Sequence, residues 1–205
     1  MNQSTFNKRI FTLDTFAVSA RALFAHTPGL AAAFTRHTLS RAFTEKIMLA
    51  VTCVNGCRYC SYAHVRLALQ AGMNDAELHD LLSGELDHIA PQEQTAILFA
   101  QHYAEQGDRY DAAAWQTLEQ TYGAETARGM LVHIRLISFA NLYGNTFDAL
   151  LERLQLKPVM GSHLFDEVVV LIVGGTVVPL GLLIGVLLQR LRAALRRVSL
   201  KAQHD

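Results

Sequence analysis

An uninterrupted apolar run near the C-terminal end constrains the fold of this chain more than any other feature. From Val168 to Leu188 no residue is charged, and the run reads VVVLIVGGTVVPLGLLIGVLL. A helix needs about 20 predominantly apolar residues to cross a bilayer. Apolar residues make up 51% of the chain against 18% charged, an excess that points to one such stretch. We therefore predict a transmembrane segment over residues 164–189.

The residues within and after this run indicate how it would lie in a membrane. Gly174, Gly175 and Pro179 interrupt it, which a membrane helix tolerates better than a soluble one, so we expect a kink near Pro179. The alternative is a buried hairpin or oligomer-core helix broken at the glycines. Residues 190–205 form a basic tail suited to anionic headgroups, with a solvated tail as the equal alternative.

Residues 1–160 predict a single all-α domain. Apolar residues recur at spacings of three and four, without the alternation of a half-buried strand. Capping residues at the starts and glycines at the ends place most boundaries. The expected helices cover residues 15–26, 29–39, 42–53 and 57–71, begin at Asn74, Pro91 and Asp111, and end with a long segment over residues 124–156.

Charge and cysteine content narrow the classes of function. The formal net charge is zero, so there is no global basic field, and we expect no nucleic-acid partner. The N-terminal segment lacks the pattern of a secretory signal. Three cysteines spaced Cys53-x3-Cys57-x2-Cys60 in such a chain indicate reactive or metal-binding thiols rather than a disulfide framework.

Two of these cysteines have the spacing of a redox pair. Asn55-Gly56 is a turn signal that should end one helix and begin the next, which places Cys57 at a helix N-terminus and Cys60 one turn further. Unpaired N–H groups and the positive end of the helix dipole favour a thiolate there. A sulfenic acid formed on one thiol could condense with the other to a disulfide.

Two further side chains could carry protons for this chemistry. His64 follows Cys60 by four residues and so lies on the same helix face, where an imidazole exchanges protons near neutral pH. Glu45 lies on the preceding helix. If the two helices fold back at the turn, its carboxylate could reach the thiols or orient His64.

Two metal-binding interpretations compete with the redox one. The spacing of the three cysteines also matches the iron–sulfur site of radical S-adenosylmethionine enzymes, although that site lies in an α/β barrel and this chain reads as helical. Adding His64 gives a Cys3His zinc set, but Cys53 and His64 would be about 16 Å apart on a continuous helix. We therefore predict no metal and no cofactor.

The stretch from Glu45 to His64, with the following HVRLALQAGMNDAELHDLL, resembles the carboxymuconolactone decarboxylase and alkylhydroperoxidase (AhpD-like) superfamily. The resemblance extends over about residues 20–150, and its specific signal lies in residues 45–82. Members of this superfamily are all-α homo-oligomers, commonly trimers or multiples of trimers. Members with the Cys-x-x-Cys pair are thiol peroxidases, so the resemblance implies a peroxiredoxin-type oxidoreductase.

The resemblance also implies roles for individual residues. Cys60 would be the peroxidatic nucleophile, Cys57 the resolving thiol, and Glu45 and His64 the proton relay. The helix-terminus argument instead favours Cys57 as the more acidic thiol. The best-studied members carry a histidine between the cysteines, where this chain has Tyr59.

The complete hypothesis is a membrane-associated peroxidase. Its partners would be a hydroperoxide substrate, a thiol or dithiol reductant, membrane lipid and further copies of the chain. Residues 1–160 would form the catalytic domain on the cytoplasmic side of a single-pass membrane protein. The competing hypothesis is a non-enzymatic helical oligomer that senses redox state at a membrane.

Overall fold

The computed structural model describes residues 6–25, 39–157, 159–161 and 163–201, with side chains up to Arg192. Over these residues the secondary structure is helical and no strand occurs, which confirms the all-α prediction. The expected helix over residues 29–39 lies outside the described residues except for Leu39. The helices are α1 (Leu13–Ala25), α3 (Arg41–Asn55), α4 (Arg58–Gln70), α5 (Asp75–Ser83), α6 (Pro91–Glu105), α7 (Ala112–Tyr122), α8 (Ala124–Leu154) and α9 (Leu164–Lys201).

The helix boundaries follow local capping chemistry. Asn74 and Glu77 form the predicted capping box at the start of α5, and Asp111 caps α7. Gly56 ends α3 with a φ of 67°, a left-handed conformation that glycine adopts without a steric penalty. Because the chain reverses at this glycine, α4 starts directly after α3 and the two helices pack together.

The main core surrounds α3. This helix packs against α4, α5, α6 and α8, and its central residues Ile47, Leu49 and Val51 are fully buried. Ile97 of α6 and Ile134 of α8 are also fully buried in the same cluster. Removing each such side chain from water contributes about 1.5–3 kcal/mol, so α3 is the helix that anchors this half of the molecule.

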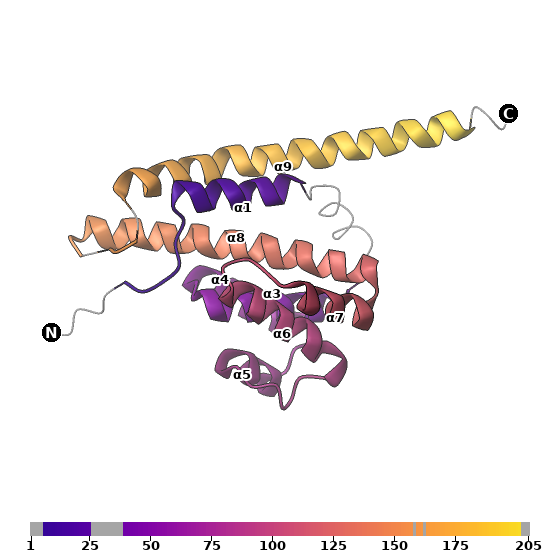
Figure 1. Cartoon of the computed structure of the whole chain (residues 1–205), viewed down its shortest axis with the longest axis horizontal. Coiled ribbons are helices and arrows are strands. Elements are labelled where there is room, and N and C mark those ends of the chain that lie inside the picture. Colours follow the sequence, from indigo (N-terminus) through magenta and orange to yellow (C-terminus); the bar gives the residue numbers. More distant parts are fainter. Residues whose placement is uncertain (1–5, 26–38, 158, 162, 202–205) are drawn as a thin grey trace.

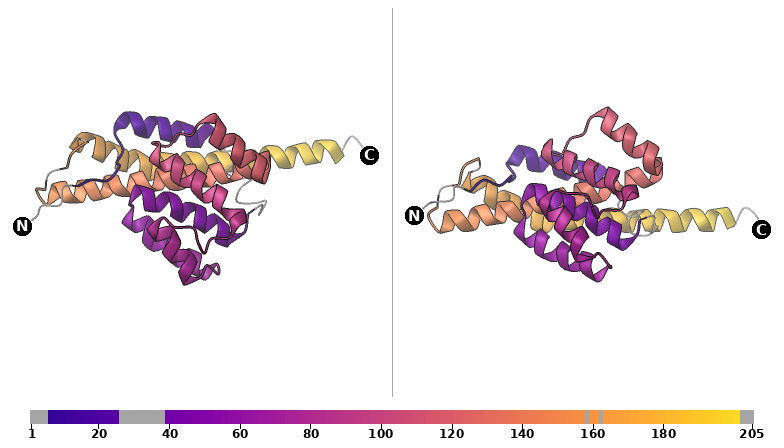
Figure 2. Two further views of the ribbon diagram at one scale, coloured as in Figure 1. Left: turned by 60° about the horizontal axis from the view of Figure 1, so that its bottom comes forward. Right: turned by 90° about the horizontal axis from the view of Figure 1, so that it is seen from below.

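A second core lies on the other side of α8. The rings of Phe11 and Phe139 have centroids 5.2 Å apart, and Val170 and Val178 of α9 are buried in the same cluster. The helices α1, α8 and α9 pack against one another, and Figure 1 shows α3 to α7 on the far side of α8 from α1 and α9. Figure 2 shows that α9 extends well past the other helices at its C-terminal end. The helix α8 therefore separates the two cores.

Helix α9 is continuous through its glycines and through Pro179, so the alternative of a hairpin broken at the glycines is wrong. The segment Leu164–Arg192 is long and apolar enough to cross a membrane, by length and composition. Only 17% of its most apolar window is buried, whereas the core helix of a soluble protein would be mostly buried. The apolar side chains of α9 are thus largely exposed, whereas those of a core helix such as α3 are buried.

Candidate active site at the Cys57 and Cys60 thiols

The two thiols of the Cys-x-x-Cys motif lie against each other at the start of α4. Cys57 is the N-cap residue of this helix, and its Sγ accepts a hydrogen bond from the backbone N–H of Cys60 at 3.3 Å. The two Sγ atoms share a hydrogen bond of 2.7 Å, and both cysteines are free thiols. The turn at Asn55-Gly56 thus places both sulfurs on one side, within easy reach of a disulfide bond.

The contact between the sulfurs makes the two thiols unequal. The hydrogen bond from the Cys60 thiol lowers the pKa of Cys57 to about 7, although burial acts in the opposite direction. The same hydrogen bond, together with burial, raises the pKa of Cys60. Cys57 is therefore the more acidic thiol, in the direction that its helix N-terminus predicts. Cys57 is fully buried, whereas Cys60 is half-buried and the more accessible of the two.

The predicted proton carriers, Glu45 and His64, contact each other. Nδ1 of His64 lies 2.6 Å from Oε2 of Glu45, which joins α4 to α3. Glu45 is buried and His64 half-buried. Cys60 and His64 are four residues apart on α4, so they lie on one face of the helix. We call Glu45, Cys57, Cys60 and His64 the thiol corner.

Helix α8 closes the thiol corner at Gly144, a residue that no local sequence pattern indicated. A Cβ atom at Gly144 would lie 2.8 Å from Sγ of Cys57, closer than real Cβ contacts allow. The absence of a side chain at this position therefore lets α8 pass directly over the thiol. A glycine inside a long amphipathic helix is a signal for such a close approach, although α8 also contains Gly129 and the sequence does not distinguish the two.

A buried carboxylate near Cys57 was also missed. Asp148 of α8 accepts hydrogen bonds from the Tyr59 hydroxyl at 2.7 Å and from Nζ of Lys8 at 2.9 Å, and it pairs with Arg58 at 2.6 Å. Burial would raise the pKa of Asp148, but these partners outweigh burial and lower it. Its negative charge opposes ionisation of Cys57. Tyr59, which lies between the two cysteines in the sequence, thus points its hydroxyl at Asp148.

Burial also shifts the pKa values of two other side chains, His133 and Cys53. Burial lowers the pKa of His133 on α8, with the charge of Glu45 acting in the opposite direction. His133 therefore lies within electrostatic range of Glu45. Burial raises the pKa of Cys53, which keeps it a protonated thiol and agrees with its interpretation as a small hydrophobic residue.

The possible metal ligands gather elsewhere in the described chain. The one group of three His, Cys, Asp or Glu side chains found there with ligand atoms within 4.8 Å of one another is His79, Asp80 and Glu85. Asp80 already accepts hydrogen bonds from the backbone N–H of His88 at 2.5 Å and from its Nδ1 at 3.0 Å. Cys53, Cys57, Cys60 and His64 do not form such a group, so the fold does not assemble the zinc set considered above.

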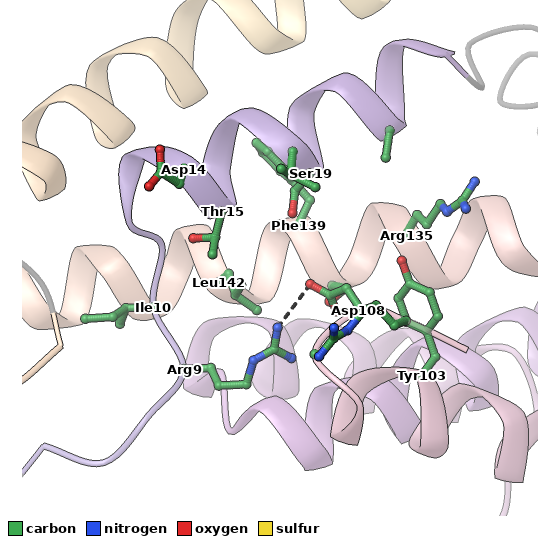
Figure 3. Close-up of a pocket in the computed structure, with 15 residues that line it drawn as sticks. Arg9, Ile10, Asp14, Thr15, Ser19, Tyr103, Asp108, Arg135, Phe139 and Leu142 are labelled. Carbon is green, nitrogen blue, oxygen red and sulfur yellow. Dashed lines mark hydrogen bonds and ion pairs between the residues drawn. The ribbon is translucent and has the colours of Figure 1, made fainter. Parts of the chain in front are cut away.

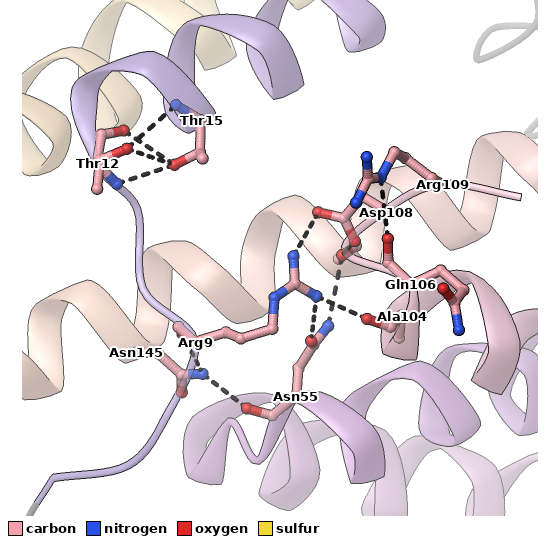
Figure 4. A network of polar contacts seen from close by, with 10 residues as sticks. Arg9, Thr12, Thr15, Asn55, Ala104, Gln106, Asp108, Arg109 and Asn145 are labelled. Atoms are coloured by element: carbon pink, nitrogen blue, oxygen red, sulfur yellow. Dashed lines mark hydrogen bonds and ion pairs between the residues drawn. The ribbon is translucent and has the colours of Figure 1, made fainter. Parts of the chain in front are cut away.

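A cavity of about 320 Å³ lies on the opposite side of α8, between α1 and the loop that follows α6 (Figure 3). Its lining includes Arg9 and Asp108, which pair at 3.1 Å, but none of the cysteines. Arg9 also donates to Oδ1 of Asn55 at 2.9 Å, and Asn145 donates to the Asn55 carbonyl at 2.8 Å (Figure 4). This network holds the turn that presents Cys57.

One comparison with known proteins agrees with the resemblance seen in the sequence. The model of the carboxymuconolactone decarboxylase family matches residues 19–102, which include α3 to α5, most of α6 and the whole thiol corner. Gly144 and Asp148 lie outside the matched region. No curated protein and no solved structure matches the chain. Over residues 19–102, the match confirms that this chain is similar to the carboxymuconolactone decarboxylase family.

Proposed function

We propose that the protein is a thiol-dependent peroxidase of the alkylhydroperoxidase kind, which reduces hydrogen peroxide or organic hydroperoxides. The observation that carries this proposal is the pair of free thiols with Sγ atoms 2.7 Å apart, one of which has its pKa lowered to about 7. A pKa near 7 keeps about half of that thiol ionised at neutral pH, and the thiolate is the form that attacks a peroxide.

The reaction follows from the two sulfurs in sequence. A thiolate attacks one peroxide oxygen, the O–O bond breaks, and the leaving oxygen takes a proton to depart as an alcohol or as water. The sulfur that attacked keeps the other peroxide oxygen and becomes a sulfenic acid. The second thiol then attacks this sulfur and water leaves, so a Cys57–Cys60 disulfide forms. A dithiol reductant restores both thiols by disulfide exchange and is itself oxidised.

Glu45 and His64 serve this cycle as the proton relay. The leaving oxygen needs a proton, and the thiol that attacks second must lose one. An imidazole hydrogen-bonded to a buried carboxylate at 2.6 Å is held in one orientation and can do both. Its place one turn beyond Cys60 on α4 puts it beside the more accessible thiol.

The observations disagree on which of the two thiols attacks the peroxide first. The lower pKa favours Cys57 as the thiol that attacks first, whereas accessibility and the family resemblance favour Cys60. Treating the Cys57→Ser and Cys60→Ser variants with peroxide and measuring sulfenic acid by mass spectrometry separates these orders. The variant that still forms a sulfenic acid retains the peroxidatic thiol.

The peroxidase proposal is tested by the rate of hydroperoxide consumption with an external dithiol. Cys57→Ser and Cys60→Ser should each abolish turnover, and Cys53→Ser is the matched control that should keep it. Full activity in a Cys57→Ala/Cys60→Ala double variant would refute the proposal.

A second function, a redox-sensing oligomer without catalysis, is favoured by the complete burial of Cys57. A fully buried thiol reacts slowly with external peroxide but can still switch the packing around it. Under this function peroxide would change the size of the assembly, as measured by light scattering, while little peroxide is consumed. Consumption of many equivalents of peroxide per chain excludes it.

The remaining parts of the proposal concern partners and location. We propose that α9 attaches the protein to a membrane and that residues 1–160 form the catalytic domain on its cytoplasmic side. The working form is a homo-oligomer, a trimer or a multiple of one. Cross-linking and membrane fractionation of the full-length chain test these points separately from the thiol chemistry.

A further inference from the structure

One side of α9 presents an apolar surface to solvent along most of its length. Between Leu164 and Arg192 its exposed positions carry apolar, glycine, proline or threonine side chains, and the two exposed charges are both arginines at the end. Monomeric soluble proteins rarely expose apolar patches larger than a few hundred Å². The largest exposed side chains of this face are Leu164, Phe165, Ile172, Val177, Leu180, Leu183, Leu187 and Leu191.

The opposite side of α9 is attached to the domain over the first half of the helix. The Tyr143 hydroxyl of α8 donates to the backbone carbonyl of Leu171 at 2.9 Å. Glu167 is completely buried and pairs with Arg153 at 2.8 Å. A Cβ atom at Gly181 would lie 2.6 Å from the ring of Phe24 on α1, so α1 and α9 are in close contact there.

This attachment conflicts with a perpendicular crossing of the bilayer. If the docked part of α9 entered the hydrocarbon core, α1 would enter beside it, with its exposed charged residues Asp14 and Arg21. Charged side chains at that depth are costly. Beyond Leu182, the last residue packed on this cluster, only a short apolar stretch precedes Arg190, well under the about 20 residues that a crossing needs.

The charges at the end of the exposed face indicate what covers it. Arg190 and Arg192 are exposed directly after the apolar stretch. An apolar face with arginines beside it suits a membrane surface rich in anionic lipid, where the side chains enter the acyl boundary and the guanidinium groups reach phosphates. A second copy of the same face would offer these arginines no exposed carboxylate from the described part of α9.

We propose that α9 stays docked on α1 and α8 and lies in the plane of an anionic membrane surface, with its exposed apolar face inserted, rather than crossing the bilayer. The polar side that an interfacial helix normally carries is replaced here by the domain itself. This inference rests on the membrane association proposed above and is independent of the thiol chemistry. A peroxidase assay therefore tests the proposed thiol chemistry, and a lipid-binding assay separately tests the placement of α9.

Depth measurements along α9 test the proposal. The full-length chain with Trp115→Phe would carry a single new tryptophan, from Ile172→Trp, Leu180→Trp or Leu187→Trp. Each variant would be added to vesicles of phosphatidylglycerol and phosphatidylcholine whose acyl chains are brominated at a shallow or a deep position. For a helix in the membrane plane, all three tryptophans should be quenched most by the shallow bromines, with similar ratios.

Other outcomes would overturn the proposal. A crossing helix separates positions 172 and 187 by about 22 Å along the membrane normal, so the quenching ratios would differ strongly. A face covered by a second copy would give no quenching by either lipid, and the particle size would rise with protein concentration. Either result rules out an in-plane helix.

The contribution of the two arginines to membrane binding can be measured separately. Replacing Arg190 and Arg192 by glutamine should lower partitioning onto anionic vesicles by about 5-fold per arginine, and high salt should have a similar effect. Arg128→Gln, an exposed position on α8, is the matched control and should leave binding unchanged. Unchanged binding in the Arg190→Gln/Arg192→Gln variant would overturn the role assigned to the lipid charge.

Discussion

The thiol corner and α9 both depart from the usual distribution of side chains, but in opposite directions. In the thiol corner, ionisable groups are turned inward: Glu45 and Cys57 are buried, and each has a hydrogen-bonding partner. In α9, side chains such as Leu180 and Leu187 are turned outward and are more than half exposed. Neither arrangement is usual, because folded proteins mostly bury large apolar side chains and expose ionisable ones.

The difference shows what kind of function each region can have. Buried titratable groups with altered pKa values occur where a protein performs chemistry, because the surroundings set which group holds the proton. An exposed apolar face carries no reactive groups. It indicates a surface that a membrane or another molecule covers. The contrast can be tested by changes that should affect one region and leave the other intact.

The largest expected effect comes from removing the charge on Glu45. Glu45→Gln keeps the shape of the side chain but leaves His64 without a carboxylate partner, so hydroperoxide reduction should slow by about 10²- to 10⁴-fold. Steady-state kinetics with a dithiol reductant measures this, and Glu85→Gln, on an exposed carboxylate beyond α5, is the control. Binding to vesicles should not change. Equal rates for the two variants would remove Glu45 from the relay.

The next effect concerns the glycine that faces Cys57. In Gly144→Ala the new methyl group would lie 2.8 Å from the Cys57 sulfur and push it away from Cys60. A displacement of about 1 Å at a reacting atom costs about 100-fold in rate. Gly181→Ala is the matched control, since its methyl group meets Phe24 on α1 instead. If both variants oxidise to the disulfide at the wild-type rate, Gly144 does not position the thiol.

A smaller effect is expected in the pH dependence of thiol reactivity. Because the pKa of Cys57 is lowered to about 7, its thiolate forms as the pH rises through 7, and alkylation by iodoacetamide should have its midpoint there. In Cys60→Ala the hydrogen-bond donor is lost, so the midpoint should move up toward the ordinary cysteine pKa of about 8.5. The rate at pH 7 should then fall by about 10-fold, as read by peptide mass spectrometry. An unmoved midpoint would exclude Cys60 as the cause.

The smallest effect is predicted for the exposed face of α9. Leu187→Asn should change the free energy of unfolding by about 0.5 kcal/mol or less, because the side chain is exposed, while it weakens vesicle binding. Val178→Asn, a buried position on the same helix, should cost about 1–3 kcal/mol because a polar amide enters an apolar cluster. Denaturation of both variants in detergent-free buffer compares them. A large loss of stability for Leu187→Asn would mean that this face is not a free surface.

Much of the fold and part of the site could be predicted from local sequence signals. The capping box at Asn74 and the turn at Asn55-Gly56 act between neighbouring residues, so the sequence reveals them directly. The contact of Glu45 with His64 could be expected once that turn was recognised, because it folds one helix back on the next. The catalytic roles of these residues stay predictions.

What could not be predicted depends on residues far apart in the chain. Gly144 and Asp148 reach the thiols only because α8 packs across α3 and α4, and no local pattern indicates which turn of α8 does so. The attachment of α9 is similar: Gly174 and Gly181 receive the rings of Tyr143 and Phe24, which lie far from them in the sequence. Spacing along the sequence shows that a close approach is possible but does not identify the partner.

The neighbouring positions of Tyr143 and Gly144 on α8 have one further consequence. Tyr143 holds α9 through the carbonyl of Leu171, and the next residue leaves the space that Cys57 occupies. A helical turn rotates as a rigid unit, so a twist of α8 driven from the lipid side would be transmitted to the sulfur within a single peptide bond. Under the proposed peroxidase function and membrane docking, bilayer composition would in that way tune the rate of peroxide consumption.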